Sequence, residues 1–158
     1  YDDIDTEAIE YAKKMVTDTI AAMISGSNTE ISGLVKEGKT SLRTDTGPSR
    51  VIGTGLAGTA SDASMLMGVM AHALDFDDVH HEMGGHPSAP VLSALLPVAE
   101  QQGASGQELL TAFVLGTEVE ISLANVLNPG LYEEGWHPTS VVGSIGAAAA
   151  VGKLLDFD

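Results

Sequence analysis

The sequence predicts an all-α fold, and three observations carry this prediction. Apolar residues recur at helical spacing in the first 26 residues, and a segment beginning near Ser61 is apolar on nearly every side, as a central helix requires. Start and stop signals of helices recur along the rest of the chain. A chain of 158 residues suits one folded body with a real core, so we expect residues 1–158 to form a single helical domain.

The N-terminal third is predicted to hold two helices followed by a loop. Thr6 or Asp5 can cap a first helix, whose apolar positions keep helical spacing until Gly26. A second helix is expected over 28–38. The polar stretch 39–50 reads as an exposed loop, and residues 51–53 as a short extended segment.

The rest of the chain is predicted to hold four helices. The first begins near Ser61 and ends beside a cluster of histidines and acidic residues, and the next runs from Ser88 to a glycine stop at Gly103. Ser105 and Glu108 form a capping-box pattern for a helix that continues to about residue 127. A last helix begins after 137–139, and its glycines at 143, 146 and 152 predict close packing against another helix.

Charge excludes several classes of partner. The chain has 7 basic and 22 acidic residues, and none of the basic residues lies between Val51 and Gly152. A net charge of −15 repels nucleic acid and anionic membranes, so we expect neither as a partner. No apolar run approaches the length of a membrane span and no export leader is visible, which favours a cytoplasmic protein. The absence of cysteine removes thiolate chemistry and cysteine-bound zinc.

The segment 72–88 concentrates groups that can transfer protons or bind metals. It holds four of the five histidines together with acidic residues at 75, 77, 78 and 82. Asp75 lies near the end of an apolar helix, where a carboxylate is unfavourable without a partner or a task, so we interpret it as functional. His72 is interpreted as a structural hydrogen-bonding residue, and Asp77 and Asp78 as more exposed groups, one of which can cap a turn.

Two histidines occupy equivalent places before helices. His86 and His137 each precede a proline and then a serine or threonine, which predicts two histidines at helix N-termini on two walls of one pocket. The alternative is that these motifs are only good helix starts and the histidines are incidental.

Two further functions remain open from the residues alone. The spacing of Asp77 with His81, and of Asp78 with Glu82, would suit a metal-dependent helical hydrolase, with Glu118, Glu120 and His137 as remote candidate ligands. The acidic composition and the Gly/Ala-rich last helix would suit a non-catalytic oligomerisation module, in which His86 and His137 would point away from each other. We expect no metal in the site, because the ligand set is incomplete.

Three segments resemble the MmgE/PrpD family, which includes 2-methylcitrate dehydratase, cis-aconitate decarboxylase and iminodisuccinate epimerase. They are AHALDFDDVHHEMGGHPSAPVLSALL, GASGQELLTAFVLGTEVE and GWHPTSVVGSIGAAAAVGKLL. The resemblance covers nearly the whole chain. It implies the N-terminal portion of a helical domain that, in family members, joins a smaller α/β domain across the active site.

The resemblance also implies site residues. Asp75, His86 and His137 stand at positions similar to family active-site residues, and Val79 stands where some members have a threonine. The family lysine and tyrosine would come from chain beyond residue 158, so residues 1–158 are expected to be catalytically incomplete. We assign catalysis to Asp75, His86 and His137, and substrate binding to Val79, Ser88, Trp136 and Thr139.

The expected function is that of a cofactor-independent lyase or isomerase acting on small di- or tricarboxylates, and 2-methylcitrate dehydratase is the member we favour. The chemistry would begin with proton removal next to a carboxylate, and histidine is the side chain best suited to this step near neutral pH. The expected partners are a small carboxylate substrate and a second copy of the protein in a homodimer.

Overall fold

The computed structural model describes residues 1–38, 43–44 and 47–157. Within these residues the chain forms seven helices and three very short strands. The helices are α1 (Thr6–Gly26), α2 (Glu30–Gly38), α3 (Ala60–His72), α4 (Ser88–Gln102), α5 (Gly106–Leu127), α6 (Gly130–Glu133) and α7 (Pro138–Leu154). The strands are β1 (Arg43–Thr44), β2 (Ser49–Arg50) and β3 (Leu56–Gly58). The expected all-α class is confirmed.

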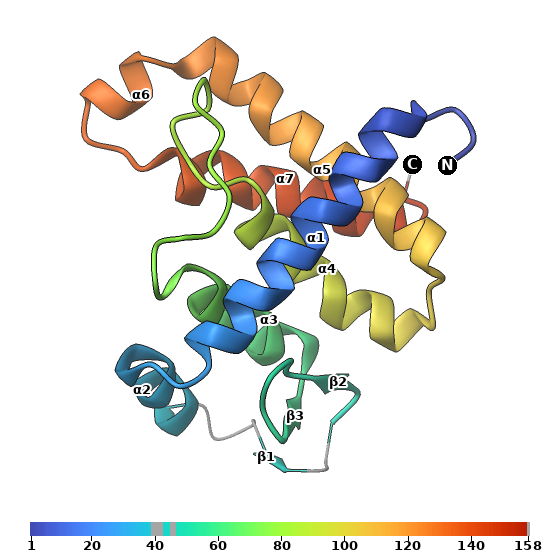
Figure 1. Cartoon of the computed structure of the whole chain (residues 1–158), viewed down its shortest axis with the longest axis vertical. Helices are drawn as coiled ribbons and strands as arrows, with labels where there is room; N and C mark the ends of the chain where they lie inside the picture. The colour runs from blue at the N-terminus through green and yellow to red at the C-terminus, as the bar shows by residue number, and fades with distance from the viewer. Residues whose placement is uncertain (39–42, 45–46, 158) are drawn as a thin grey trace.

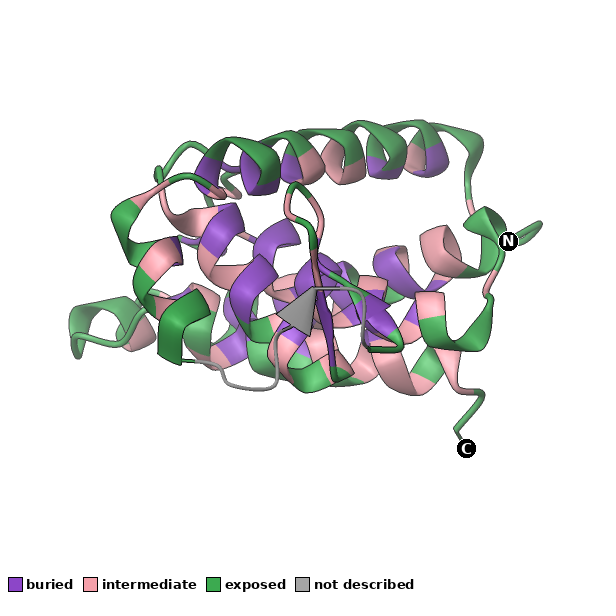
Figure 2. Cartoon of the chain, turned by 90° about the horizontal axis from the view of Figure 1, so that it is seen from below, coloured by how far each residue is buried: buried purple, intermediate pink, exposed green. Residues whose placement is uncertain are grey.

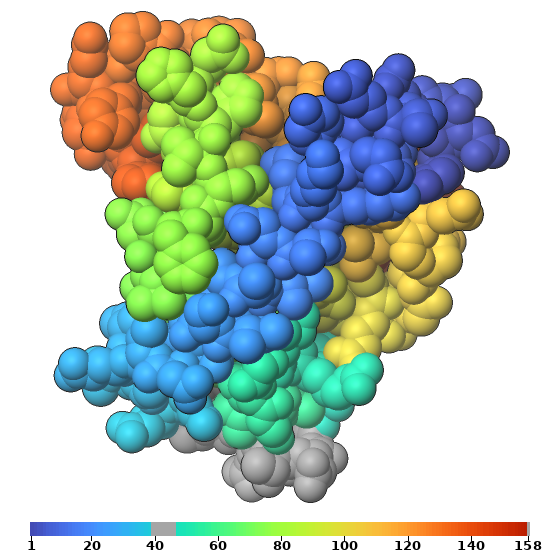
Figure 3. Space-filling view, viewed as in Figure 1, coloured from blue at the N-terminus to red at the C-terminus, as the bar shows by residue number. Residues whose placement is uncertain are grey.

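Helix α1 lies diagonally across one face of the molecule, over α3 and α4 (Figures 1 and 3). Asp5 caps it, because its side chain accepts a hydrogen bond from the backbone of Glu7. Its buried positions recur at helical spacing and face the other helices, while the opposite face is exposed (Figure 2). The sequence prediction of a one-faced surface helix is therefore confirmed.

The hydrophobic core is shared by five helices, α1, α3, α4, α5 and α7. Methionine and leucine side chains of α3 and α4 fill most of it, together with Phe113 of α5. The largest fully buried members are Met23, Leu66, Met67, Met70, Leu92, Leu95 and Phe113. Burial of this apolar surface is the main stabilising contribution to the fold.

Helix ends follow the start and stop signals at three of the predicted places. Helix α4 begins at Ser88 and ends at Gly103, which adopts the left-handed conformation at φ 62°. The capping box between Ser105 and Glu108 is present at the start of α5. Helix α3, in contrast, ends at His72, so Asp75 lies in the turn after the helix rather than within its last turn.

The region between α2 and α3 departs from the expected loop. Strands β1 and β2 each pair antiparallel with β3, which gives the strand order β1-β3-β2. The predicted extended segment at 51–53 is instead a turn between β2 and β3. Part of the predicted loop, residues 39–42 and 45–46, lies outside the described residues.

Helix α5 has the length and composition that could cross a membrane, with a mean hydropathy of 1.4 over its most apolar window. The sequence analysis expected no apolar run of the length of a membrane span, and by length and composition this expectation is wrong. In the fold, α5 contacts α1, α4 and α7 and contributes Phe113 and Ala112 to the core. A helix that packs in a core satisfies the same criterion of length and composition.

Close approach of α5 and α7 depends on glycine. A Cβ atom at Gly146 would lie 2.8 Å from the carbonyl oxygen of Gly116 and 2.9 Å from the Cβ of Glu120. A Cβ at Gly143 would lie 2.6 Å from the Cγ of Pro90 in α4. The predicted role in helix packing is confirmed for Gly143 and Gly146, which fix α7 against both α4 and α5, and it is wrong for Gly152, whose Cβ would meet no close neighbour among the described residues.

Gly146→Ala should therefore lower the melting temperature. Alanine gains about 1 kcal/mol of helix propensity over glycine, but overpacking against a neighbouring backbone costs about 1–3 kcal/mol. Gly152→Ala in the same helix is the matched control, because its Cβ would meet only the Cδ2 of Phe157 at 3.9 Å. We expect the control to hold or raise the melting temperature measured by circular dichroism. Stabilisation by both substitutions would contradict the packing argument.

Candidate active site

The connection between α3 and α4 folds back on itself and returns His86 to the end of α3. The backbone N–H of His80 donates to the carbonyl of Gly85 at 2.9 Å, and Gly84 takes the left-handed conformation at φ 64°. The side-chain amide of Asn128 donates to the carbonyl of Met83 at 2.6 Å, which fixes this connection to the end of α5. His86 is held from the other side, because its N–H donates to the hydroxyl of Thr139 at 2.9 Å.

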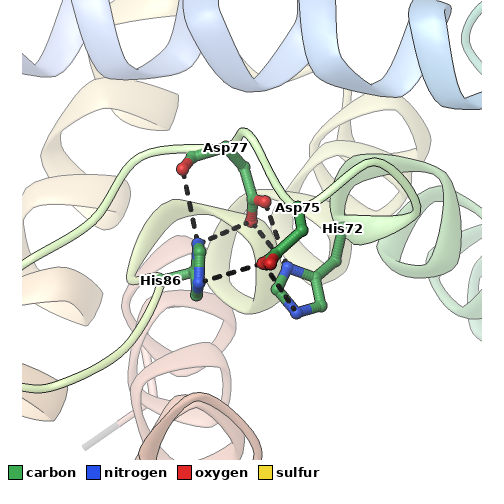
Figure 4. A group of neighbouring side chains, drawn as sticks. All are labelled: His72, Asp75, Asp77 and His86. Atoms are coloured by element: carbon green, nitrogen blue, oxygen red, sulfur yellow. Dashed lines mark hydrogen bonds and ion pairs between the residues drawn. The ribbon is translucent and has the colours of Figure 1, made fainter.

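Asp77 lies between two histidine rings at this point (Figure 4). The Nδ1 atom of His72 is 3.0 Å from its Oδ1 and 3.2 Å from its Oδ2. The Nδ1 atom of His86 is 3.3 Å from its backbone carbonyl oxygen and 3.4 Å from its Oδ2. The Asp77 side chain has 0% exposure, so these imidazoles are the partners of a carboxylate that is closed to water.

The chemistry of the acceptors fixes the hydrogens on both rings. A backbone carbonyl and a carboxylate only accept hydrogen bonds, so the Nδ1 atoms of His72 and His86 must carry the hydrogen. In the neutral imidazole, the Nε2 atom then keeps a free lone pair. Asp77 thus orients two bases with their reactive nitrogen turned away from the buried carboxylate.

Asp75 faces these Nε2 atoms from the solvent side (Figure 4). Its Oδ1 lies 3.6 Å from the Nε2 of His86 and 4.0 Å from the Nε2 of His72. Its backbone has φ 54°, a left-handed conformation that aspartate tolerates better than most residues and that is found at functional sites. The Asp75 side chain is 80% exposed, so it can contact a ligand directly.

His137 completes a group of three imidazoles. Its ring centroid lies 6.2 Å from that of His72 and 6.5 Å from that of His86, and it stacks on His86 at an interplanar angle of 21°. A pocket of about 360 Å³ opens beside the group. Its lining comes from α3, from the first turns of α4 and α7, and from His137, namely Gly68, His72, Ala89, Pro90, His137, Thr139 and Ser140.

The residues assigned to substrate binding from the sequence lie in different environments. Thr139 lines the pocket and accepts the hydrogen bond from His86. Ser88 is buried, and its hydroxyl donates to Asp78 at 2.5 Å. Val79 and Trp136 are exposed and are absent from the pocket lining. Of these four residues, only Thr139 lines the pocket, while Ser88 is held in a buried hydrogen bond.

Sequence reasoning missed His72 and Asp77 as site residues. The interpretation of Asp77 as an exposed group is wrong, since the residue has 3% exposure, while its apolar neighbours Leu74 and Phe76 are exposed. Hydrophobicity alone would predict the opposite, with Leu74 and Phe76 buried and Asp77 exposed. The signal available in the sequence was the short interval of five residues from His72 to Asp77. A turn directly after the helix is needed to bring these two side chains into contact.

Asp78 is half-buried, and its partner is Ser88 ten residues further on, so the expectation of an exposed group that caps its own turn is wrong for this residue. Its Oδ1 accepts from the backbone N–H of Ser88 at 3.2 Å, which stabilises the first turn of α4. Burial raises the pKa of the Asp78 carboxyl, and the two hydrogen bonds from Ser88 offset part of this effect.

The structure does not support the metal ligands predicted from the sequence, but it brings a different set of possible ligands together. The segment from Asp77 to Glu82 is not helical, so the helical spacing on which that alternative relied does not exist. Among the described residues, the ligand atoms of a different group lie within 4.8 Å of one another, and its members are His72, Asp75, Asp77 and His86. Two imidazoles and two carboxylates are ligands that zinc and other transition metals accept.

Glu120 of α5 is buried beneath this region with 0% exposure. Neither carboxyl oxygen has a hydrogen-bond partner among the described residues. Burial, together with the charge of Asp78, raises the pKa of Glu120 to about 9. The side chain is therefore protonated and neutral at pH 7, which lowers the free-energy cost of placing it against Gly143 and Gly146 of α7.

Comparison with known proteins agrees with the sequence resemblance. The family described as MmgE/PrpD N-terminal domain matches residues 1–158. The chain is 33% identical over 162 residues to the cis-aconitate decarboxylase of Homo sapiens, which covers 93% of this chain and 31% of the relative. It is 31% identical over 160 residues to the cis-aconitate decarboxylase of Aspergillus terreus, covering 98% of this chain and 32% of the relative.

These matches establish the class of protein. The chain belongs to the MmgE/PrpD family and corresponds to its N-terminal domain. It spans about a third of the length of the curated relatives that it matches.

Glu120→Gln should change the dependence of stability on pH. In the unfolded chain this carboxyl loses its proton above a pKa of about 4.5, whereas in the folded chain it keeps the proton until about pH 9. The folded state then binds more protons than the unfolded state, so the contribution of Glu120 to stability falls as the pH rises between these values. Glutamine mimics the neutral acid at every pH. Melting curves of both proteins should agree below about pH 4 and diverge towards pH 9, with the variant more stable; a constant difference would contradict this.

Proposed function

We propose that the protein carrying this chain is a cofactor-independent lyase that acts on a small tricarboxylate by proton transfer. The observation that carries the proposal is the meeting of three imidazoles with Asp75 and a buried Asp77 beside a pocket. Such a group supplies a proton acceptor and a proton donor near neutral pH. The pocket volume of about 360 Å³ suits a small substrate.

The geometry assigns different tasks to the residues. His86, held by Asp77 at Nδ1 and by Thr139 at its backbone, presents a free Nε2 atom in fixed orientation. His137 lines the pocket with its ring centroid 6.5 Å from that of His86, so it can act as a second proton-transfer group. Asp75 can stabilise the imidazolium that forms when His86 takes a proton, because its carboxylate lies 3.6 Å from Nε2.

Two reactions of this kind are compatible with the residues. In a decarboxylation, the bond to a carboxylate carbon breaks, carbon dioxide leaves, and the electron pair left on the substrate takes a proton from an imidazolium. In a dehydration, an imidazole removes the proton next to a carboxylate, and a second group protonates the departing hydroxide. The relatives named cis-aconitate decarboxylase favour the first reaction, with cis-aconitate as substrate. The sequence expectation of 2-methylcitrate dehydration is the second candidate.

A substrate with several carboxylates needs nearby positive charge, which the described residues around this pocket do not provide. Each like-charge pair at about 4 Å costs roughly 4 kcal/mol in a partly buried site, and one helix N-terminus returns about 0.3–1 kcal/mol of this. The N-termini of α4 and α7 face the pocket, but no Lys or Arg occurs from Val51 to Gly152. We propose that cations from parts of the protein matching the remaining length of the relatives complete the site, and that residues 1–158 alone do not turn over substrate.

A non-catalytic role fits the geometry less well. That alternative expects His86 and His137 to point apart with no cleft near them, whereas their rings stack at 6.5 Å and His137 lines a pocket. The homodimer and the cytoplasmic location expected from the sequence remain predictions.

A substrate screen tests the proposed reaction class. Purified full-length protein should convert cis-aconitate with release of carbon dioxide, or 2-methylcitrate with loss of water; both are followed by mass spectrometry of the products. Citrate and iminodisuccinate are the comparison compounds. Conversion of iminodisuccinate alone would make the protein an isomerase and would remove the lyase proposal. No conversion of any of the four would remove it as well.

Substitutions at the site should separate catalysis from stability. His137→Ala should lower kcat by roughly 10²–10⁴-fold, the usual contribution of a proton-transfer group. Asp75→Asn should also lower kcat, because it removes the charge that stabilises the imidazolium. Both side chains are exposed, and asparagine also tolerates the left-handed backbone of residue 75, so the melting temperature should change little. His81→Ala is the control, because this exposed histidine belongs to the same segment but lies outside the cluster. Unchanged kcat in both site variants would exclude these residues from the reaction.

A further inference from the structure

Three electron-pair donors converge on the solvent side of the histidine pair. The Nδ1 atoms of His72 and His86 are committed to Asp77, so the Nε2 atoms present lone pairs. These face the Oδ1 atom of Asp75 at 4.0 Å and 3.6 Å. A lone pair does not donate a hydrogen bond to a carboxylate, so the arrangement favours a positive charge between the three atoms, which either a proton on Nε2 or a bound cation supplies.

The spacing of these atoms suits a single metal ion. Ligands bound at about 2.0–2.2 Å to one ion lie roughly 3–4 Å from each other, and the two separations to Asp75 fall in that range. Two histidines and one carboxylate form a ligand set that first-row transition metals accept with positions left open. Histidines that bind metal usually donate their other N–H to a carboxylate or carbonyl, as both do here to Asp77.

Access and charge also favour a cation. The side chain of Asp75 is 80% exposed, and His72 lines the open pocket, so an ion can reach the site without unfolding. The net charge of −15, with no basic residue from Val51 to Gly152, attracts a cation to this part of the chain. Nitrogen ligands favour zinc over magnesium or calcium, which prefer oxygen.

We propose that His72, His86 and Asp75 bind one divalent transition-metal ion, such as Zn²⁺, and that the bound ion inhibits the enzyme. The ion would occupy the Nε2 atom of His86 that the reaction requires for proton transfer. The inhibition rests on the proposed lyase function, whereas the binding rests only on the geometry of the three ligands. The ion is an inhibitor in this proposal and has no part in the reaction.

Calorimetric titration of the full-length protein with ZnCl₂, after treatment with a chelator, tests the binding. We expect one site per chain that is lost or weakened at least about tenfold in His72→Ala and in Asp75→Asn. His81→Ala is the matched control and should bind as the parent does. The proposal is overturned if no binding tighter than millimolar is seen, if both cluster variants bind like the parent, or if His81→Ala loses the site.

A second measurement on the unsubstituted protein avoids any effect of the variants on folding. Nitrogen NMR of histidine-labelled protein should show zinc-dependent shifts at the Nε2 atoms of two histidines, while their Nδ1 atoms keep their hydrogens. Shifts confined to other histidines, or metal bound at Nδ1, would contradict the assigned ligands.

Turnover measurements separate the inhibition from the function. Activity should be unchanged by chelator, should fall in parallel with zinc occupancy, and should be unaffected by MgCl₂. If chelator abolishes activity and zinc restores it, the ion is a cofactor and the inhibitory role is wrong. If the protein has no lyase activity at all, the proposed function and the inhibition both fail, while calorimetry still decides whether the ion binds.

Discussion

The site depends on one buried carboxylate. Asp77 accepts from His72 through its side chain and from His86 through its backbone carbonyl, and it does so with its carboxylate closed to water. A buried carboxylate requires partners of this kind, because an unpaired charge would cost several kcal/mol. The same contacts fix the hydrogens of both rings at Nδ1. The need to pair the Asp77 carboxylate therefore determines where the α3–α4 connection folds back. It also leaves the Nε2 atoms of both histidines free to face Asp75.

The close contact of α5 and α7 places the second wall of the pocket. Gly143 and Gly146 allow α7 to lie against Pro90 and Gly116, and the N-terminal end of α7 places His137 and Thr139 in the pocket lining beside His72. Glu120 occupies the same contact without a hydrogen-bond partner among the described residues, and it is tolerated because burial keeps it protonated. The architecture thus combines close backbone packing with a buried acid directly beneath the site.

Much of the helical framework follows from local signals. The capping box at Ser105, the stop at Gly103 and the start at Ser88 were all predicted, because each depends on neighbours only a few residues away. The end of α3 was predicted too late, since the apolar run continues past His72 and gives no local signal for the turn at Asp75. The short strands were missed for a similar reason, because β3 is stabilised by pairing with segments distant in sequence.

The sequence by itself determined the helical class, the family and the segment that holds the chemistry, because periodicity, capping residues and motif order are properties of the chain alone. It also singled out Asp75, His86 and His137, which the structure brings to one pocket region. Only the tertiary structure decided that Asp77 is buried and Phe76 exposed, and that His72 joins the group. Those outcomes depend on how the α3–α4 connection packs against α5 and α7, and such contacts leave no periodic signal in the sequence.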